Sequence, residues 1–239
     1  MRILITNDDG INSPSLHKLA LWANKFAEVT VVAPKVEQSG KSQAIDIIRA
    51  VEVLRVDFEE NIEAYSVDST PADCVRFGTV GLHKEYDLVL SGINRGYNMG
   101  KDIIYSGTVG AIFEAYGQGY RAMAISTDYS SFDTAVANLD RVYSYITEND
   151  LFDYCMLYNV NIPTETSGEI RITRQGKSCY SDEFVLVGEN MYKQVGELLP
   201  EGCDDLCFDT NAIKAGYISI CPMTTERCDL EVFRKLTNK

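Results

Sequence analysis

The chain has 239 residues, of which 45% are hydrophobic and 24% are charged, and its formal net charge is −13. This composition is typical of a globular protein with a sizeable core and excludes a disordered chain. The negative charge disfavours a duplex nucleic-acid partner, and a bound phosphate would need a metal ion or backbone N–H groups to offset the same field.

Targeting segments and disulfides are not expected. The apolar run at residues 3–5 is too short for a signal peptide, and no stretch approaches the roughly 18–20 apolar residues of a membrane helix. We therefore expect a cytoplasmic protein that does not contact a membrane. The seven cysteines are odd in number and scattered, which argues against a disulfide framework. Cys203 and Cys207 are close enough for zinc, but further ligands are distant in sequence, and reduced thiols are the simpler interpretation.

The first residues predict a β–α–β unit. Residues 2–6 are an apolar run typical of a buried strand, and residues 28–33 predict a second strand that stops at Pro34. Between them, Ser13 and Pro14 are a cap and first-turn pair, after which apolar residues recur at helical spacing. A unit of this kind places its two strands parallel.

The middle of the chain continues this alternation. Residues 44–67 alternate and are rich in Ile and Val, so we expect a β-excursion there. Residues 70–73 predict a helix start capped by Thr70. Apolar runs and helical spacing then predict strands at 87–91, 121–126 and 155–160, and helices at 109–117 and 132–146.

The C-terminal part departs from the pattern. Residues 164–205 are polar and strand-like and predict a hairpin excursion, and residues 216–221 predict a last strand. We therefore expect a single domain over residues 1–239, with a core at about 1–163 and 206–223. Its predicted class is α/β, doubly wound around a mostly parallel sheet, which binds ligands at the carboxyl ends of its strands.

Asp8 and Asp9 follow the first predicted strand and precede Gly10. Adjacent carboxylates repel each other, and a hard divalent cation removes that repulsion. Mg²⁺ binds one or two carboxylates together with waters and phosphate oxygens. The alternative is a solvated acidic turn, because residues 7–10 also have the composition of a turn.

Polar segments predicted at the same sheet edge favour the metal site. Residues 38–42 follow the second strand with Gly and hydroxyl residues, and Asn94 follows the strand at 87–91 with a neutral oxygen. Residues 98–100 continue that loop, and residues 105–109 enter a helix whose first N–H groups can bind an anion, although a cap alone is the simpler interpretation of Ser106. Together these groups predict a site for a metal ion and a phosphate.

The remaining polar candidates are weaker. His17 lies off the apolar stripe of the first helix and His83 lies at a helix end, so neither is expected to act in catalysis. Lys101 and Arg95 are better placed to meet phosphate oxygens, and a solvated role is equally open for each.

These segments resemble the SurE (survival protein E) family of nucleotidases and acid phosphatases. The similarity covers almost the whole chain, at residues 7–11, 32–34, 38–40, 70–75, 91–94, 98–100, 105–109, 159–163, 173–176 and 216–220. It implies a phosphomonoesterase that hydrolyses nucleoside 5′-monophosphates, and 3′-monophosphates as a further class, with one Mg²⁺ or Mn²⁺ ion per subunit. It also implies a Rossmann-like domain with a protruding β-hairpin, assembled as a homodimer or homotetramer with exchanged C-terminal elements.

The resemblance also assigns roles to residues. The implied metal ligands are Asp8, Asp9, Ser39 and Asn94, and the implied phosphate contacts are Gly40, Asn98, Ser106, Gly107 and Thr108. Asp8 and Asp9 are the catalytic candidates; whether Asp8 only binds metal, activates water or attacks phosphorus is open. The chain departs from the family at Ser69, where glycine is usual, and it has no histidine beyond His83 to match one that some members carry near the C-terminus.

Two other classes also place acids after a first strand. A receiver module needs a phosphate-accepting aspartate at the end of a later strand, where this chain has Asn94. A phosphatase of the haloacid-dehalogenase type needs two aspartates separated by one residue, and Asp8 and Asp9 are adjacent.

The predicted hairpin excursion also bears on assembly. It includes a run of apolar residues that would form an exposed patch on a monomer: Phe184, Val185, Leu186, Val187, Met191 and Tyr192. We therefore expect a partner chain to cover this segment, the alternative being that it folds back on its own domain.

Overall fold

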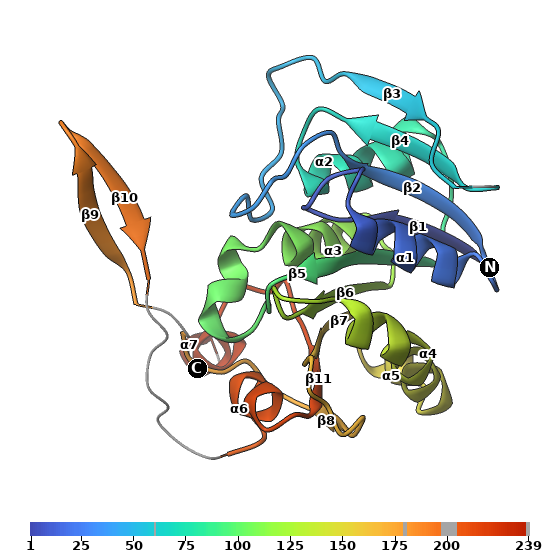
Figure 1. The fold of residues 1–239 in the computed structure, drawn as a ribbon. Helices are drawn as coiled ribbons and strands as arrows, with labels where there is room; N and C mark the ends of the chain where they lie inside the picture. The colour runs from blue at the N-terminus through green and yellow to red at the C-terminus, as the bar shows by residue number, and fades with distance from the viewer. Residues whose placement is uncertain (60, 179–180, 197–204, 238–239) are drawn as a thin grey trace.

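A nine-stranded sheet forms the centre of the computed structural model, which describes residues 1–59, 61–178, 181–196 and 205–237 (Figure 1). Its strand order is β3-β4-β2-β1-β5-β6-β7-β11-β8. Six strands run parallel: β1 (Arg2–Thr6), β2 (Glu28–Pro34), β4 (Glu63–Val67), β5 (Leu88–Arg95), β6 (Ala122–Thr127) and β7 (Leu157–Ile162). The other three are the edge strands β3 (Val53–Val56) and β8 (Ile170–Ile172), and β11 (Ile218–Pro222), which lies between β7 and β8. β3 and β11 run antiparallel to β4 and β7, and β8 runs parallel to β11.

Helices cover both faces of the sheet because its strands are apolar on both sides. Ile3 and Ile5 of β1 belong to one buried cluster and Leu4 to the other. The first cluster packs under α1 (Pro14–Ala23), α4 (Asp133–Glu148) and the short α5 (Leu151–Tyr154). The second packs under α2 (Pro71–Arg76), its continuation η1 (Phe77–Gly81) and α3 (Gly107–Gly117). The predicted doubly wound α/β class with a mostly parallel sheet is therefore confirmed.

Two helix starts follow the predicted chemistry. Pro14 is the first residue of α1, although the Ser13 side chain makes no capping hydrogen bond. Thr70 Oγ1 accepts a hydrogen bond from the Asp73 N–H at 3.2 Å and so caps α2. Pro71, the first residue of α2, lies close to Gly107 at the start of α3.

The segment 44–67 was predicted as a β-excursion, and this is wrong in two respects. Residues 44–52 contain no strand, and the strands that follow, β3 and β4, extend the main sheet instead of leaving it. β4 pairs in parallel with β2, so the alternation of its residues reflects a position in the central sheet. Residues 44–52 form a loop that lies near the start of α2, where the Asp46 N–H donates to Asp73 Oδ2 at 2.9 Å.

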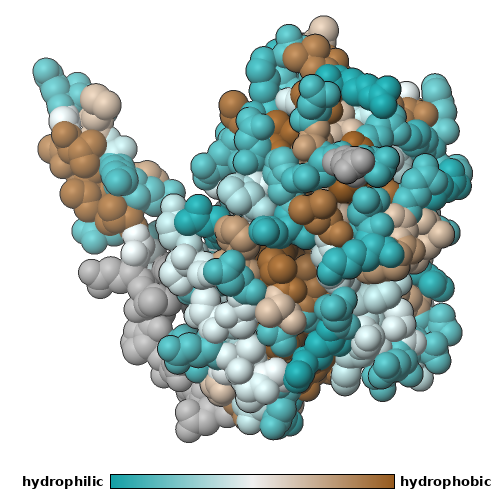
Figure 2. All heavy atoms as spheres, turned by 45° about the vertical axis from the view of Figure 1, so that its right-hand side comes forward, coloured by the Kyte–Doolittle hydropathy of each residue, from teal (hydrophilic) through white to brown (hydrophobic). Residues whose placement is uncertain are grey.

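The segment 164–205 contains a hairpin, but part of it joins the main sheet as β8. The hairpin consists of β9 (Glu183–Gly188) and β10 (Met191–Val195) and projects from the domain (Figure 1). Figure 2 shows apolar side chains gathered on it, and Phe184, Leu186 and Met191 are each 60% or more exposed. Cys203 and the rest of residues 197–204 lie outside the described part of the chain.

Besides the short α5, three helical segments were not predicted as such: the 3₁₀ helix η2 (Gly100–Tyr105), α6 (Asp209–Lys214) and α7 (Leu230–Thr237). The first two lie beside the loop that follows β5, since the Gly100 N–H donates to Asp209 Oδ2. Among the residues described, we find no helix with both the length and the apolar character needed to cross a bilayer.

Candidate active site

Asp8 and Asp9 lie directly after β1, at the edge of the sheet where the parallel strands end. The turn that holds them is built by Asn7, whose side chain accepts from the Gly10 N–H at 3.2 Å and donates to the Gly10 carbonyl at 3.1 Å. Gly10 has a φ of +98°, which favours glycine, and the next N–H, of Ile11, donates to the Pro34 carbonyl at 2.7 Å. The acidic pair is thus held against the end of β2.

Asp8 is a buried carboxylate, only 5% exposed. The Thr108 hydroxyl donates to its Oδ1 at 2.6 Å, and a side chain at Gly107 would meet Asp8 Oδ2 at 3.2 Å. Burial raises the pKa of Asp8 above its usual value, Glu37 adds to this, and hydrogen bonds from Thr108 act in the opposite direction. Thr108 therefore fixes the orientation of the Asp8 carboxylate, but as a neutral group it does not offset the cost of the buried negative charge.

Asp9 is less buried, yet its Oδ2 is inaccessible and has no hydrogen-bond partner in the described part of the chain. Burial and then the neighbouring Asp8 raise the pKa of Asp9 to about 6, and Glu37 adds to this shift. An interaction with the Arg95 backbone offsets it in part. A buried carboxylate oxygen without a partner is costly, and a cation would remove that cost.

The loop after β2 connects Asp8 to the start of α3. The Gln38 N–H donates to the Asp8 carbonyl at 2.7 Å, and the Ser42 N–H donates to the Tyr105 carbonyl at 3.0 Å. Between these anchors lie Ser39 and Gly40, both exposed. Ser39 Oγ donates to Glu37 Oε1 at 2.7 Å, so its lone pairs remain available to a metal ion.

Asn94 lies near the end of β5, the strand that pairs with β1 on the side opposite β2. Its Nδ2 donates to the Gly96 carbonyl at 2.7 Å, which leaves the amide oxygen as the free end of the side chain. This orientation suits a neutral oxygen ligand.

Asn98 is held by β6 and β7 rather than by its own strand. Its Nδ2 donates to Ser126 Oγ at 2.8 Å, and its N–H donates to Asn161 Oδ1 at 2.9 Å. The Asn98 carbonyl accepts from the side chains of Asn159 and Asn161 at 2.7 and 2.8 Å. One N–H of the Asn98 amide therefore remains for an anion.

The first turn of α3 supplies the remaining groups. Ser106 caps the helix by accepting from the Val109 N–H at 3.1 Å, as its sequence context predicted. Whether Ser106 is only a cap stays open, because the cap uses the hydroxyl as an acceptor and leaves its hydrogen for a ligand. Because Thr108 contacts Asp8, the N-terminus of α3 adjoins the acidic pair and contributes partial positive charge there.

Two residues that sequence reasoning did not assign to the site organise the loop that carries Asn98. Asp209 is 1% exposed and accepts from the N–H groups of Gly100, Gly176 and Thr210 at 3.0, 2.7 and 2.7 Å. Gln175 Nε2 donates to the Gly100 carbonyl at 2.9 Å. Gln175 lies in the run 173–176 that resembles the family, but only the folded chain shows which loop it holds.

The other polar candidates lie elsewhere or remain exposed. His17 pairs with Glu59 at 2.8 Å and stacks on Phe58 with ring centroids 3.9 Å apart, an arrangement that needs no ligand. Arg95 lies over the ring of Tyr129 at 4.8 Å, and Lys101 is exposed. His83 occupies a turn after η1, with a φ of +53°.

The donor set fits a hard divalent cation. Within the described residues, no group of three or more His, Cys, Asp or Glu side chains could hold a metal, so a metal here would rest on two carboxylates plus neutral oxygens. The buried partnerless oxygen of Asp9 and the raised pKa values of both aspartates are the observations that match. Oxygen ligands of this kind suit Mg²⁺ or Mn²⁺.

Comparison with known proteins gives a consistent result. The family model described as Survival protein SurE matches residues 3–182. A protein named 5′-nucleotidase SurE from Thermosipho melanesiensis is 34% identical, covering 100% of this chain and 97% of that protein. Its namesake from Caldanaerobacter subterraneus subsp. tengcongensis is 37% identical, with 99% and 96% covered. The crystal structure of the SurE protein from Aquifex aeolicus superposes with a TM-score of 0.81 at 29% identity, covering 100% and 99%. The chain therefore belongs to the survival protein SurE family.

Proposed function

We propose that this chain is a 5′-nucleotidase that hydrolyses nucleoside 5′-monophosphates to nucleoside and phosphate, with 3′-monophosphates as a further substrate class. The names of its full-length relatives support the reaction. The observation that carries the proposal to this chain is the contact between Asp8, beside the partnerless oxygen of Asp9, and Thr108 in the first turn of α3. It brings the carboxylates proposed to bind a cation next to the helix start proposed to bind the phosphate.

The site residues fall into two groups, those that bind the cation and those that bind the phosphate. We propose that one Mg²⁺ or Mn²⁺ ion per subunit is held by Asp8, Asp9, Ser39 and Asn94, and that it supplies neutralisation of the charge that develops on the phosphoryl oxygens. Phosphate contacts are proposed for Gly40, Asn98, Ser106, Gly107 and Thr108.

The first turn of α3 contributes to transition-state stabilisation without moving. Its N–H groups have no partners within the helix, and the Ser106 hydroxyl hydrogen is not used by the cap. The Thr108 hydroxyl instead holds the Asp8 carboxylate in one orientation, whether Asp8 binds only the cation or also positions the attacking water. Asp9 Oδ2 has no hydrogen-bond partner in the described part of the chain and the pKa of Asp9 is raised, so its ionised form depends most on the cation.

Asp8→Asn tests the proposal. Asparagine can still accept from Thr108, so the fold should persist while turnover of p-nitrophenyl phosphate and of adenosine 5′-monophosphate falls by about 100-fold or more. The matched control is Asp153→Asn, an exposed aspartate whose pairing with Arg121 is 3.5 Å long. Near-normal turnover by Asp8→Asn would refute the role of the acidic pair.

The proposal extends to the setting of the enzyme. We propose a single domain, active in the cytoplasm as a homodimer or homotetramer, with exchange of C-terminal elements between subunits. The exposed apolar side chains of the β9–β10 hairpin support assembly, because a patch of this kind is costly on a monomer.

A further inference from the structure

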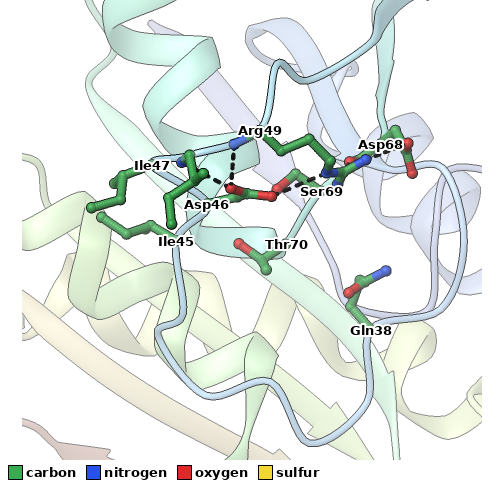
Figure 3. A pocket seen from close by; sticks show the side chains of 9 residues that line it. Gln38, Ile45, Asp46, Ile47, Arg49, Asp68, Ser69 and Thr70 are labelled. Atoms are coloured by element: carbon green, nitrogen blue, oxygen red, sulfur yellow. Dashed lines mark hydrogen bonds and ion pairs between the residues drawn. The ribbon is translucent and has the colours of Figure 1, made fainter.

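The loop that follows β2, residues 38–46, is anchored at both ends, and we refer to it as the β2 loop. At its start, the Gln38 N–H donates to the carbonyl of the first aspartate of the acidic pair at 2.7 Å. Near its end, the Thr70 hydroxyl donates to the Ala44 carbonyl at 2.6 Å. Gln38 and Asp46 mark the two ends of the loop in Figure 3. The loop residues proposed to bind metal and phosphate lie between these two anchors.

Between its anchors, the β2 loop lies directly on α3. The Ser42 N–H donates to the Tyr105 carbonyl at 3.0 Å, and the Ser42 hydroxyl donates to the Ile104 carbonyl at 2.7 Å, both just before the helix. A side chain at Gly110 would come within 2.1 Å of the Ser42 carbonyl oxygen, so the loop backbone touches the helix there. Ser42 has a φ of +55°, a conformation that a serine keeps only when its surroundings hold it. The contacts with α3 therefore determine the path of the loop.

Glu114 provides a further contact between α3 and the β2 loop. It is only 8% exposed, and its Oε2 accepts from the Gln43 side-chain amide at 3.1 Å, across a separation of 71 residues. Its Oε1 accepts from the Arg76 guanidinium of α2 at 2.8 Å and from Gln118 Nε2 at 3.1 Å. One carboxylate oxygen is thus bound to the helices, which directs the other oxygen at the loop.

The helix that carries Glu114 is also the helix proposed to bind the phosphate. Gly107, Gly110 and Glu114 are three and four residues apart, so they lie on one face of α3. That face adjoins Asp8 at Gly107 and contacts the β2 loop at the other two positions. The acidic pair and the loop with Ser39 are therefore both positioned by the same face of one helix.

We propose that Glu114 is a positioning residue of the active site. Acting through Gln43, it holds the β2 loop on α3 so that Ser39 reaches the cation and Gly40 reaches the phosphate. The inference rests on the roles proposed above for these two residues and adds the group that places them. A carboxylate suits this task because it accepts from several donors at once, and the ion pair with Arg76 offsets the cost of its burial.

Two glutamines that donate to the same carboxylate provide matched variants. Gln43→Ala removes only the contact with the loop, and Gln118→Ala removes a hydrogen bond of the same length at the end of α3. In the metal-free protein, trypsin should cleave after the exposed Lys41 about fivefold faster in Gln43→Ala than in the wild type, because the loop opens more often. Gln118→Ala should be cleaved at the wild-type rate. Mass spectrometry of the released peptides measures the cleavage.

Mn²⁺ binding reports the consequence for the site. By calorimetry, Gln43→Ala should bind Mn²⁺ about fivefold more weakly than Gln118→Ala, while the Tm values of the two variants stay close. Gln43→Glu keeps the size of the side chain but places a second carboxylate against Glu114, so it should weaken binding further. Because Glu114 acts through Gln43, adding Gln43→Ala to Glu114→Ala should cause no further loss of affinity.

Failure of this proposal can be told from failure of the proposed function. If Gln43→Ala is cleaved faster and binds Mn²⁺ more weakly than Gln118→Ala while the wild type hydrolyses no monoester, the proposed activity fails and the positioning role stands. Equal cleavage rates and equal Mn²⁺ affinities in the two variants would overturn the role of Glu114. An equal loss of affinity in both variants relative to the wild type would also overturn it, since the effect would then not pass through the loop.

Discussion

Thr108 donates its hydroxyl hydrogen to Asp8 Oδ1 at 2.6 Å, across a separation of 100 residues. The contact joins the end of β1 to the first turn of α3, and both partners are buried. A neutral hydroxyl fixes the direction of the carboxylate without cancelling its charge. Burial raises the pKa of Asp8, so its ionised form is costly without a cation beside it, as expected of a cation site.

Removing one of the two carboxylates should stabilise the metal-free protein above neutral pH. The pKa of Asp9 is raised from 3.8 to about 6, so the folded state binds its proton more tightly than the unfolded state. Stability contributed by that proton is present below pH 3.8 and is lost as pH rises through about 6. Asp9→Asn should therefore weaken this decline and raise Tm by a few degrees at pH 7.5 in EDTA.

Thermal unfolding in EDTA at pH 4.5 and pH 7.5 measures this effect. Asp153→Asn, which changes an exposed aspartate, should follow the wild type at both values. A Tm for Asp9→Asn below that of the wild type at pH 7.5 would contradict the prediction.

Metal affinity should rise with pH for the same reason. A cation must displace the proton that Asp9 holds below about pH 6, so Mn²⁺ binding should strengthen between pH 5 and 7 and level off above. Isothermal titration at several pH values provides the measurement. Asp9→Asn should bind more weakly and with a smaller pH dependence.

Chelation should abolish turnover. Exhaustive dialysis against EDTA removes a cation held by oxygen ligands alone, and either Mg²⁺ or Mn²⁺ should restore the rate. Hydrolysis of p-nitrophenyl phosphate before and after dialysis is the assay. Full activity in the chelated protein would rule out the metal role of the acidic pair.

Asp209→Asn should damage the loop that carries Asn98. The carboxylate accepts three backbone N–H groups, and an amide NH₂ in place of one oxygen would face a donor, at a cost of about 2–3 kcal/mol. Urea unfolding should show this loss, and KM should rise as the Asn98 loop loosens. Asp205→Asn, in the exposed turn before α6, is the control; equal effects of the two substitutions would contradict the argument.

The hairpin should hold subunits together. Phe184 and Leu186 lie on one face of β9 and are 65% and 60% exposed, so replacing both with serine should cost the isolated subunit little. Light scattering at micromolar concentration should show a dimer or tetramer for the wild type and a smaller species for the double variant. Tyr154→Ser, at a side chain that is 84% exposed, should not change the assembly, and a monomeric wild type would exclude this interface.

The sequence predicted those parts of the fold that depend on residues close to one another in the chain. The apolar run of β1, the Thr70 cap and the position of the acidic pair at the strand end all follow from neighbouring residues. Residues 44–52 were predicted as strand because they are rich in Ile and Val, but in the structure they form no strand and do not join the sheet. Asp209 was missed because its role depends on Gly100, 109 residues away, and no periodicity reports such a contact.

The close approach of Gly100 to the backbone of Lys177 restricts which residue can occupy position 100. A side chain at residue 100 would come within 2.0 Å of the Lys177 carbonyl oxygen, so the two backbones are in direct contact and leave no room for a side chain. Lys177 precedes the β9–β10 hairpin, and Gly100 follows the loop of Asn98. Any side chain at residue 100 would therefore push the Lys177 backbone away from the loop that carries Asn98, so glycine at this position is what lets the two segments pack together.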